Sequence, residues 1–307
     1  MTLLARNAAP ASALPRPAGH RQRKPPSASR LWRVGVYLAL VAAALFFLLP
    51  MYVLVVTSLK PFSQVSLATM WELPSAVSFD SFARAWTGDP SKGVSGLGAN
   101  VWNSILMAIP ATVLSAGIGS INGYVFAKWR FRGSNTLFVL FVGGLFVPYL
   151  SVLIPMVTVL RSLHLYGTIP GLIFVHVVYG LPICTLIFRN LYSTIPNELV
   201  ETAKIDGAGI LRIYTRVLLP LSIGAFAVTF IWQFTAIWND FLFGIVVTSQ
   251  PKVQPVTVAL NNLAGSYVVE WNVQMAGALI AALPTLVIYL FLGRYFVRGL
   301  LAGSVKG

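Results

Sequence analysis

Residues 195–221 read IPNELVETAKIDGAGILRIYTRVLLPL, a polar and charged stretch between two long apolar runs. A helix is expected at its start, because the ring of Pro196 fixes φ for a first helical turn. Glu198 and Glu201 lie near that turn, where the helix dipole favours negative charge. The helical pattern then continues to Asp206.

Gly207 ends this pattern, because glycine tolerates the backbone angles of a sharp turn. A second short helix is expected over 210–217, before Pro220 and the next apolar segment. The stretch therefore predicts a helix, a glycine turn and a helix at a membrane face. Charged side chains are scarce elsewhere in the chain, so their concentration here indicates a surface on which another protein docks.

The composition is that of an integral membrane protein. Apolar residues make up 57% of the 307 residues, charged residues make up only 10%, and the mean hydropathy is +0.77. Soluble domains carry about 25% charged residues, so a soluble fold is excluded. The single cysteine, Cys184, excludes an intramolecular disulfide.

Six apolar stretches are long enough to cross about 30 Å of hydrocarbon as helices. They are 34–59, 100–127, 137–160, 169–191, 219–247 and 274–297. Of the 22 lysines and arginines, 17 fall in the N-terminal tail, the second–third and fourth–fifth connections and the C-terminus. The positive-inside rule therefore places both termini and the 195–221 stretch in the cytoplasm. The net charge of +14 sets topology and attracts anionic lipid, and it does not indicate nucleic-acid binding.

The remaining segments define the expected domain organisation. Residues 1–33, rich in Pro, Ala and Arg, are predicted to form a disordered basic cytoplasmic tail, with a transit peptide as the alternative. The transmembrane domain is expected over 34–298. It contains an external loop at 60–99, with a short helix near 79–86, and a cytoplasmic loop at 192–218. Residues 299–307 are expected to form a cytoplasmic C-terminal tail.

The 195–221 stretch resembles the cytoplasmic coupling loop of bacterial ABC-importer permeases. The pattern of that loop is Glu-Ala-Ala, three residues, Gly, nine residues and Ile-x-Leu-Pro. The matching residues of this chain are Glu201, Thr202, Ala203, Gly207, Val217, Leu219 and Pro220. The spacing is kept throughout, and the two departures are Thr202 for Ala and Val217 for Ile.

Weaker motifs extend the resemblance over nearly the whole chain past the tail, to the sugar permeases of the maltose-transporter type. They lie at 50–52, 58–60, 103–104, 131–133, 147–148, 154–155, 238–240, 295–299 and 302–307. Their order around the coupling loop makes the resemblance specific. It implies an all-α polytopic membrane protein with six transmembrane helices and the type I ABC-importer permease fold, in the bacterial inner membrane.

The resemblance also implies partners and a mechanism. Two permease chains, expected here to be different, form the pore, a cytoplasmic ABC ATPase dimer holds their coupling loops, and an extracytoplasmic binding protein delivers a sugar. ATP binding closes the ATPase dimer, draws the loops together and turns the pore outward, and hydrolysis resets it. The residues implied in coupling are Glu198, Glu201, Thr202, Ala203, Asp206, Gly207, Val217, Leu219 and Pro220. Glu201 is expected to make a polar or ionic contact with the ATPase, Ala203 to allow close approach and Gly207 to make the turn.

No ATP site is expected in this chain, because the motif G-x-x-x-x-G-K-[ST] is absent from the sequence. ATP and Mg²⁺ are therefore assigned to the partner ATPase, and the chain is not expected to be an enzyme. No cluster of His, Cys and Glu has the spacing of metal ligands, so no cofactor or metal is expected. His176, beside Tyr179 in the fourth span, is expected to be packed and hydrogen-bonded.

Polar residues inside the spans are candidate pore residues, because leaving them in lipid is costly. The candidates are Gln233, Trp238, Asn239 and Asp240, and Asp240 is the clearest, about six turns into the fifth span. Two interpretations stay open. Hydrogen bonds between helices would fix the two pore halves, whereas a polar wall would contact sugar hydroxyls as they pass. Trp238 is suited either to stacking on a sugar ring or to packing.

An ion-coupled secondary transporter is the alternative from another functional class. Such proteins usually show repeats, broken helices and midplane charges, whereas this chain has one Asp in its spans and a large docking loop. Within importers, residues 253–260, 264–266 and 271–276 look most like those of permeases for glucose or mannose. Maltose or trehalose, glucosylglycerol and glycerol phosphate are the alternative substrates.

Overall fold

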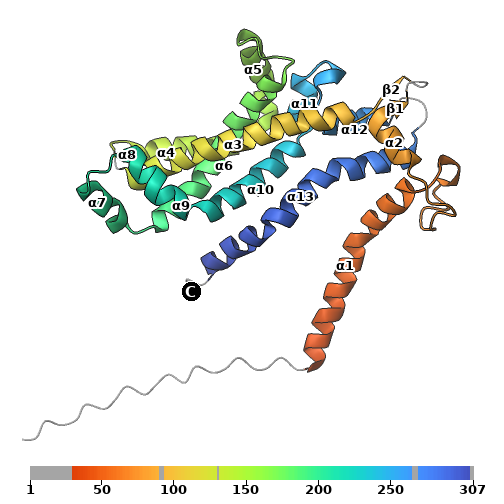
Figure 1. Ribbon diagram of the computed structural model, residues 1–307, viewed down its shortest axis with the longest axis horizontal. Coiled ribbons are helices and arrows are strands. Elements are labelled where there is room, and N and C mark those ends of the chain that lie inside the picture. Colours follow the sequence, from red (N-terminus) through yellow and green to blue (C-terminus); the bar gives the residue numbers. More distant parts are fainter. Residues whose placement is uncertain (1–29, 90–92, 130, 265–268, 305–307) are drawn as a thin grey trace, which may run out of the picture. The chain divides into compact units, whose positions relative to one another are not determined.

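The computed structural model describes residues 30–89, 93–129, 131–264 and 269–304 (Figure 1). The predictions made for the tail up to residue 29, and for residues 305–307, lie outside the described residues. The chain divides into two units, 1–49 and 50–307, and the division falls inside α1 (Arg30–Ser58). In the first unit α1 exposes large apolar side chains along its length, among them Phe46 and Phe47, as a helix that faces lipid does.

The second unit is built almost entirely of helices. After the end of α1 it contains η1 (Phe62–Gln64), α2 (Asp80–Thr87), β1 (Gly88–Asp89), β2 (Val94–Ser95), α3 (Gly98–Lys128), α4 (Ser134–Gly143), η3 (Gly144–Phe146), α5 (Tyr149–Ser162), α6 (Ile169–Thr194), α7 (Asn197–Ile205), α8 (Ile210–Ile213), the π-helical turn η4 (Tyr214–Leu218), α9 (Leu219–Leu221), α10 (Ile223–Trp238), α11 (Leu242–Val247), η5 (Pro251–Val253), α12 (Val256–Leu263) and α13 (Trp271–Ser304). The short helix predicted near 79–86 is confirmed as α2, and its position on the external side stays a prediction. The strands β1 and β2 pair antiparallel, with Gly88 opposite Ser95, and this hairpin was not predicted.

Among the described residues, four helices are long and apolar enough to cross a membrane: Trp32–Ser58, Gly98–Lys128, Ile169–Thr194 and Trp271–Tyr295. Two bent pairs bring the number to six when each pair counts as one span. Four of the six predicted spans, the first, second, fourth and sixth, are therefore single helices, whereas the third and fifth are not continuous. The helix α13 also continues to Ser304, so residues 299–304 are helical where a tail was expected.

The third predicted span bends by 102° between Ser134–Phe146 and Tyr149–Ser162. Val147 and Pro148 lie between the two halves with extended backbone angles. A proline disfavours the helical conformation of the residue before it and supplies no N–H to continue the helix. The prediction of one helix over 137–160 was therefore wrong. Hydropathy did not reveal the break, because the sequence stays apolar across it.

The fifth predicted span, 219–247, is broken twice. Helix α9 meets α10 at Ser222, and the helical stretches Ile210–Leu221 and Ile223–Trp238 differ in direction by 77°. The second break follows Trp238, and Asp240 lies in it, before α11. Asp240 was placed about six turns into a helix; it is instead a capping residue, whose carboxylate accepts hydrogen bonds from the N–H groups of Phe243 (3.4 Å) and Gly244 (3.1 Å).

The helices α3 and α6 run alongside each other at the centre of the second unit (Figure 1). Gly119 and Gly123, spaced as in G-x-x-x-G, allow the two backbones to approach closely. A Cβ atom at Gly123 would lie 2.6 Å from the Cβ atom of Phe188, and one at Gly119 would collide with Cys184. The closeness of this pair therefore depends on the absence of side chains at both glycines.

Replacing Gly119 by leucine is expected to separate α3 from α6 and to expose Cys184, the single cysteine of the chain, which is fully buried. Overpacking of this kind costs about 1–3 kcal/mol or more. Labelling of the detergent-solubilised complex with N-ethylmaleimide should rise from background to near completion in Gly119→Leu. The matched control is Gly117→Leu on the same helix, where a Cβ atom would meet nothing within 4 Å. Equal labelling of both variants would contradict the packing argument.

Two buried clusters fill the second unit. One contains Trp238, Phe243 and residues of α3, α6 and α12, and the other contains Tyr124, Tyr192 and residues of α7, α8 and η4. At the α2 end, Arg84 pairs with Asp89 at 3.3 Å and with Glu270. Through these two ion pairs, Arg84 ties the β1–β2 hairpin to the start of α13. The second cluster lies directly behind the 195–221 stretch.

Candidate functional site: a docking loop and a polar cavity

The docking loop, defined here as residues 195–221, begins with α7 and a glycine turn. Pro196 is the residue just before the helix, and Glu198 lies in its first turn. At the other end Gly207 has φ +75°, the left-handed region. The Gly207 N–H donates to the carbonyl of Lys204 at 3.0 Å, and the Ala208 N–H donates to the carbonyl of Ala203 at 2.9 Å. These two bonds form a Schellman motif, so the predicted turn at Gly207 is confirmed.

The second half of the loop differs from the prediction. Its helix was expected to end before Pro220, yet it continues through α8, η4 and α9 to Leu221. The π-helical turn makes this possible, because the N–H of Leu219 bonds to the carbonyl of Tyr214, five residues back. The wider turn gives the Pro220 ring room that an α-helix would not provide.

Buried tyrosines anchor the loop to the long helices. The Tyr214 hydroxyl donates to Ser120 Oγ (3.0 Å), which is bonded in turn to the Tyr192 hydroxyl (2.6 Å). The Tyr192 hydroxyl donates to Ser222 Oγ (3.3 Å), and Ser222 donates to the Leu219 carbonyl (2.8 Å), which completes a chain of hydrogen bonds. The chain joins η4, α3, α6 and the α9–α10 bend. All four side chains are buried, so water cannot replace these hydrogen bonds when the loop is displaced.

Removing the Tyr192 hydroxyl is expected to destabilise the fold, because each of the two buried serine hydroxyls, Ser120 and Ser222, loses one of its two hydrogen-bond partners. The cost of such a loss is about 1–3 kcal/mol. Tyr192→Phe should therefore lower the thermal midpoint of the purified complex by several degrees. Tyr289→Phe, which removes a hydroxyl from an exposed residue of α13, should leave the midpoint nearly unchanged. A midpoint shift of the same size in both variants would show that the buried chain of hydrogen bonds contributes nothing specific.

The end of α3 holds the start of the loop. Lys128 Nζ donates to the Ile195 carbonyl at 2.5 Å and to Asn197 Oδ1 at 2.8 Å. Trp129 lies beside Tyr124, and Lys204 Nζ lies 4.8 Å from the centroid of the Trp129 ring. Sequence reasoning missed the anchoring role of Lys128 and Trp129. Lys128 was counted only as a basic residue, and Trp129 only as part of the connection between the second and third spans. Nothing in their local sequence indicates that they contact a loop about 70 residues later.

The residues implied in coupling do not all face outward. Glu198, Glu201, Thr202, Asp206, Gly207 and Pro220 are exposed, and Ala203, Val217 and Leu219 are half-buried. The Thr202 hydroxyl donates to the Glu198 carbonyl at 2.8 Å, so the departure from alanine is satisfied within α7. Ala203, expected to allow close approach of a partner, packs instead against the cluster behind the loop.

Two apolar side chains that sequence reasoning overlooked are the most exposed in the loop. Ile205, at the end of α7, is 86% exposed, and Leu211, in α8, is 73% exposed. The two side chains lie in α7 and α8, the helices on either side of the Gly207 turn, so the loop exposes apolar side chains as well as the carboxylates of α7.

A cavity of about 210 Å³ lies between α6 and the α10–α11 break, and several polar side chains line it although most of its surface is apolar. Its lining includes His176, Tyr179, Trp232, Gln233, Asp240 and Phe243. Of the four candidate pore residues, Gln233 and Asp240 line it. Trp238 is only 1% exposed and donates from Nε1 to the Ala281 carbonyl at 2.8 Å, so it packs in the core instead. Asn239 donates to the Thr235 carbonyl of its own helix at 2.9 Å and does not line the cavity.

His176 was expected to be packed and hydrogen-bonded, and the structure confirms the packing. The ring is buried and packs edge-on against Phe243. Its Nε2 atom has no hydrogen-bond partner, however, and lies 3.7 Å from Asp240 Oδ2. Within the described parts of the chain, no group of three or more His, Cys, Asp and Glu side chains is placed to hold a metal ion.

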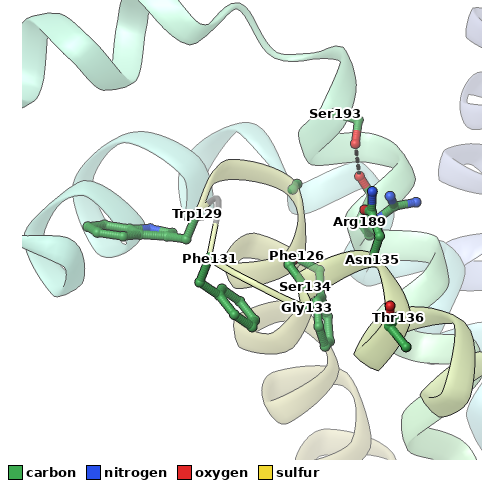
Figure 2. A pocket seen from close by; sticks show the side chains of 10 residues that line it. Phe126, Trp129, Phe131, Gly133, Ser134, Asn135, Thr136, Arg189 and Ser193 are labelled. Atoms are coloured by element: carbon green, nitrogen blue, oxygen red, sulfur yellow. Dashed lines mark hydrogen bonds between the residues drawn. The ribbon is translucent and has the colours of Figure 1, made fainter.

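A second cavity, of about 590 Å³, lies where the ends of α3 and α6 meet the start of α4 (Figure 2). The Ser193 hydroxyl, shown with a dashed line, donates to the Arg189 carbonyl at 2.8 Å. The guanidinium group of Arg189 lies 3.9 Å from the centroid of the Phe138 ring. This cavity borders the docking loop, but none of the residues implied in coupling lines it.

Comparison with known proteins places the chain in a family. Residues 115–301 match the family described as binding-protein-dependent transport system inner membrane component. Over 273 residues the chain is 47% identical to a probable ABC transporter permease of Pyrococcus horikoshii, covering 89% of this chain and 96% of that protein. It is 34% identical over 291 residues to a xylose/arabinose import permease of Haloferax volcanii, covering 88% and 92%. The names of further relatives differ in the compound transported.

A solved structure agrees in fold. It is a crystal structure of a bacterial ABC transporter involved in the import of the acidic polysaccharide alginate, with a TM-score of 0.75 at 20% identity, covering 89% of this chain and 99% of that one. The chain therefore belongs to the binding-protein-dependent transport system inner membrane components, as a multi-pass permease subunit of an ABC importer whose ATPase is a separate partner.

Proposed function

We propose that this permease subunit imports a monosaccharide such as glucose or mannose and couples to its ATPase through the docking loop. The observation that carries the coupling is the contrast between the two faces of the loop. Its outer face exposes Ile205 and Leu211, whereas its inner face is bound through Tyr214 to buried residues of α3 and α6. A surface of this kind both receives a partner and transmits the partner's movement.

The proposed cycle follows from that contrast. ATP binding closes the ATPase dimer on the cytoplasmic side and draws the docking loops of two permease chains together. The Schellman turn at Gly207 and the chain of hydrogen bonds through Ser120 and Ser222 make the loop rigid, so its displacement moves α3, α6 and α10. The pore then opens outward, and hydrolysis resets it. ATP and Mg²⁺ act on the ATPase, and this chain supplies the rigid connection.

The proposed assembly contains a second, different permease chain, an ATPase dimer and an extracytoplasmic sugar-binding protein. In this assembly both termini and the docking loop lie in the cytoplasm, an orientation that the distribution of basic residues supports. Lys128 and Arg189 agree with this orientation, since both lie at the docking-loop end of their helices. Anionic lipid would be attracted to the same face.

The sugar is proposed from residues 253–276, which look most like those of glucose and mannose permeases. A relative named for xylose and arabinose supports the monosaccharide class. Maltose or trehalose, glucosylglycerol and glycerol phosphate are the other candidates, because the names of relatives differ in the compound transported.

The test is uptake of a labelled panel, beginning with glucose and mannose, in cells with and without this gene and with and without an ionophore. The proposal expects one sugar to lose its uptake when the gene is deleted, and that uptake to resist the ionophore. Uptake that the ionophore abolishes while ATP is maintained would instead indicate an ion-coupled secondary transporter. Loss of a disaccharide or of glycerol phosphate would keep the importer and change its substrate.

A further inference from the structure

We propose that the second cavity, where the ends of α3 and α6 meet the start of α4, binds the phosphate group of an anionic phospholipid. It is called the α4 cavity below, and its polar lining residues are Ser134, Asn135, Thr136, Arg189 and Ser193. None of the candidate pore residues or of the residues implied in coupling lines it. Its occupation therefore does not depend on which sugar is carried.

The charge of the α4 cavity is one-sided. Of the ten residues of the described chain that line it, Arg189 alone is charged, and none is an aspartate or a glutamate. Arg132 lies in the sequence between two lining residues, Phe131 and Gly133, and adds positive charge nearby. A hollow lined by one sign of charge concentrates ions of the opposite sign, so the occupant is expected to be an anion.

Arg189 is held at the wall of the cavity without an acceptor. Its guanidinium group lies 3.9 Å from the centroid of the Phe138 ring, which fixes its position. The Nε atom is buried and has no hydrogen-bond partner, and within the described parts of the chain no ion pair joins Arg189 to an acidic residue. Buried donors are rarely left unpaired. Since the guanidinium fork matches the geometry of a phosphate group, a phosphate in the cavity would supply the missing acceptor.

The start of α4 adds donors from a second element. Gly133, the residue before the helix, has φ +84° and no side chain with which to cap it. The Leu137 N–H donates to the Gly133 carbonyl at 2.9 Å, but the N–H groups of Asn135 and Thr136 donate to no described residue. Free N–H groups at the start of a helix attract anions. Two such groups and the unpaired guanidinium group therefore border the same hollow.

The polar side chains gather on one side of the cavity. Figure 2 shows Ser193, Arg189, Asn135 and Thr136 together, with Trp129 on the other side. Arg189 and Ser193 are about one turn apart on α6, and the Ser193 hydroxyl donates to the Arg189 carbonyl at 2.8 Å. Guanidinium, amide and hydroxyl groups thus face one space from two helices, an arrangement that suits the several oxygens of one phosphate group.

The position of the cavity favours a lipid over a soluble anion. It lies where the predicted second span ends, at Ala127, and just before the third begins, at residue 137. Beyond the cavity α4 exposes apolar side chains, among them Leu137, Val139 and Leu140, along which acyl chains can lie. The volume of about 590 Å³ is within the roughly 300–1,000 Å³ of small-molecule sites, enough for a phosphate group and its glycerol.

The competing occupant is an acidic side chain of a partner subunit, which would meet the same donors. The two occupants differ in what they respond to. A lipid site depends on the lipid headgroup and keeps its affinity for added lipid when the subunits are assembled. A site for a partner's carboxylate is filled in the assembled complex, and it affects the association of the subunits instead.

The test is binding of a fluorescent short-chain phosphatidylglycerol to the delipidated complex of both permeases and the ATPase in an uncharged detergent. Unlabelled phosphatidylglycerol, phosphatidylcholine and inorganic phosphate are the competitors. We expect phosphatidylcholine to require a concentration about ten-fold higher or more than phosphatidylglycerol, because its headgroup has no net charge. Inorganic phosphate should compete more weakly still, since it has no chains to bury. Phosphate that competes as well as the lipid would overturn the lipid as the occupant.

Arg189→Gln is expected to weaken binding of phosphatidylglycerol about ten-fold or more, because it removes a charge-assisted contact. The matched control is Arg161→Gln, since Arg161 also lies over an aromatic ring, 4.8 Å from the centroid of Tyr166, but outside the cavity. Arg212→Gln removes an exposed charge of the docking loop, also outside the cavity. Both controls should bind as the wild type does. Equal weakening in all three variants would overturn the site and leave only a general attraction by charge.

A second pair of variants leaves α6 unchanged. Gly133→Asn and Gly133→Asp have nearly the same shape, both residues tolerate the left-handed region, and a Cβ atom at Gly133 meets nothing within 4 Å. The carboxylate of Gly133→Asp should weaken lipid binding about ten-fold relative to Gly133→Asn. Protection of the buried Cys184 from maleimide shows which variants are folded, and only these are compared. Equal binding by the two variants, or loss of ATPase with unchanged lipid binding in Arg189→Gln, would overturn the proposal.

Discussion

Gly207→Pro is expected to reduce ATP-driven uptake to background while the permease still inserts in the membrane. Gly207 has φ +75°, and proline is fixed near −65°, so the turn between α7 and α8 cannot form. Proline also removes the N–H that donates to the Lys204 carbonyl. The combined cost is about 3 kcal/mol or more, which corresponds to a factor of about 100 in the population of the native loop. The measurement is uptake of the labelled sugar together with the amount of permease in the membrane.

A graded series separates the turn from a general effect of mutation. Gly207→Asn should retain most of the uptake, because asparagine tolerates the left-handed region. Gly207→Ala should lose about ten-fold, since that region costs other L-residues roughly 1–2 kcal/mol. Gly209→Ala is the matched control, because Gly209 has φ −72° and a Cβ atom there meets nothing within 4 Å. Near-normal uptake in Gly207→Pro would remove the docking loop from the coupling mechanism.

The turn at Gly207 could be predicted because local sequence determines it. A helix whose last turn is followed by glycine has few other ways to satisfy its final carbonyl groups, and Pro196 and Glu198 mark the opposite end. The six apolar segments were predictable for a related reason, since hydropathy depends only on the residues of each segment. The orientation of those segments also followed from the count of basic residues and stays a prediction.

The breaks within the third and fifth spans could not be predicted from hydropathy, because apolar character continues across Val147 and on both sides of Asp240. The same limit left two roles open for Trp238, stacking on a sugar ring or packing. The helix ends at this residue, and the side chain packs in the core against Phe234. The position at which a helix ends determines the direction in which each of its last side chains points.

The contacts of the docking loop were also beyond the sequence. Ser120, Tyr192 and Tyr214 come from segments that lie far apart along the chain, and each is unremarkable in its own segment. Ile205 and Leu211 are apolar residues of short helices, and most such residues in amphipathic helices face a core. Only the packed structure shows that the inner positions are already filled and that these two side chains remain outside.

Replacing Ile205 and Leu211 together by aspartate is expected to abolish binding of the ATPase. If both side chains are hot spots of the interface, each contributes about 2 kcal/mol or more, and two losses correspond to roughly a thousand-fold weaker association. The aspartate at position 205 would also lie next to the exposed Asp206 and about one helical turn from the exposed Glu201, where like charges repel. The measurement is the amount of ATPase that co-purifies with a tagged permease, together with sugar-stimulated ATP hydrolysis.

The controls show whether the loss belongs to docking. Leu67→Asp changes an 88% exposed leucine before α2, away from the docking loop, and should leave the ATPase bound. Cys184 should stay protected from maleimide in the double variant, because both replaced side chains lie outside the buried clusters. Salt separates the apolar contribution from that of Glu201: Glu201→Gln should weaken binding mainly at low ionic strength, whereas the Ile205 and Leu211 variants should bind weakly at every salt concentration. Full co-purification of the ATPase with the double variant would mean that the loop does not dock through its exposed apolar pair.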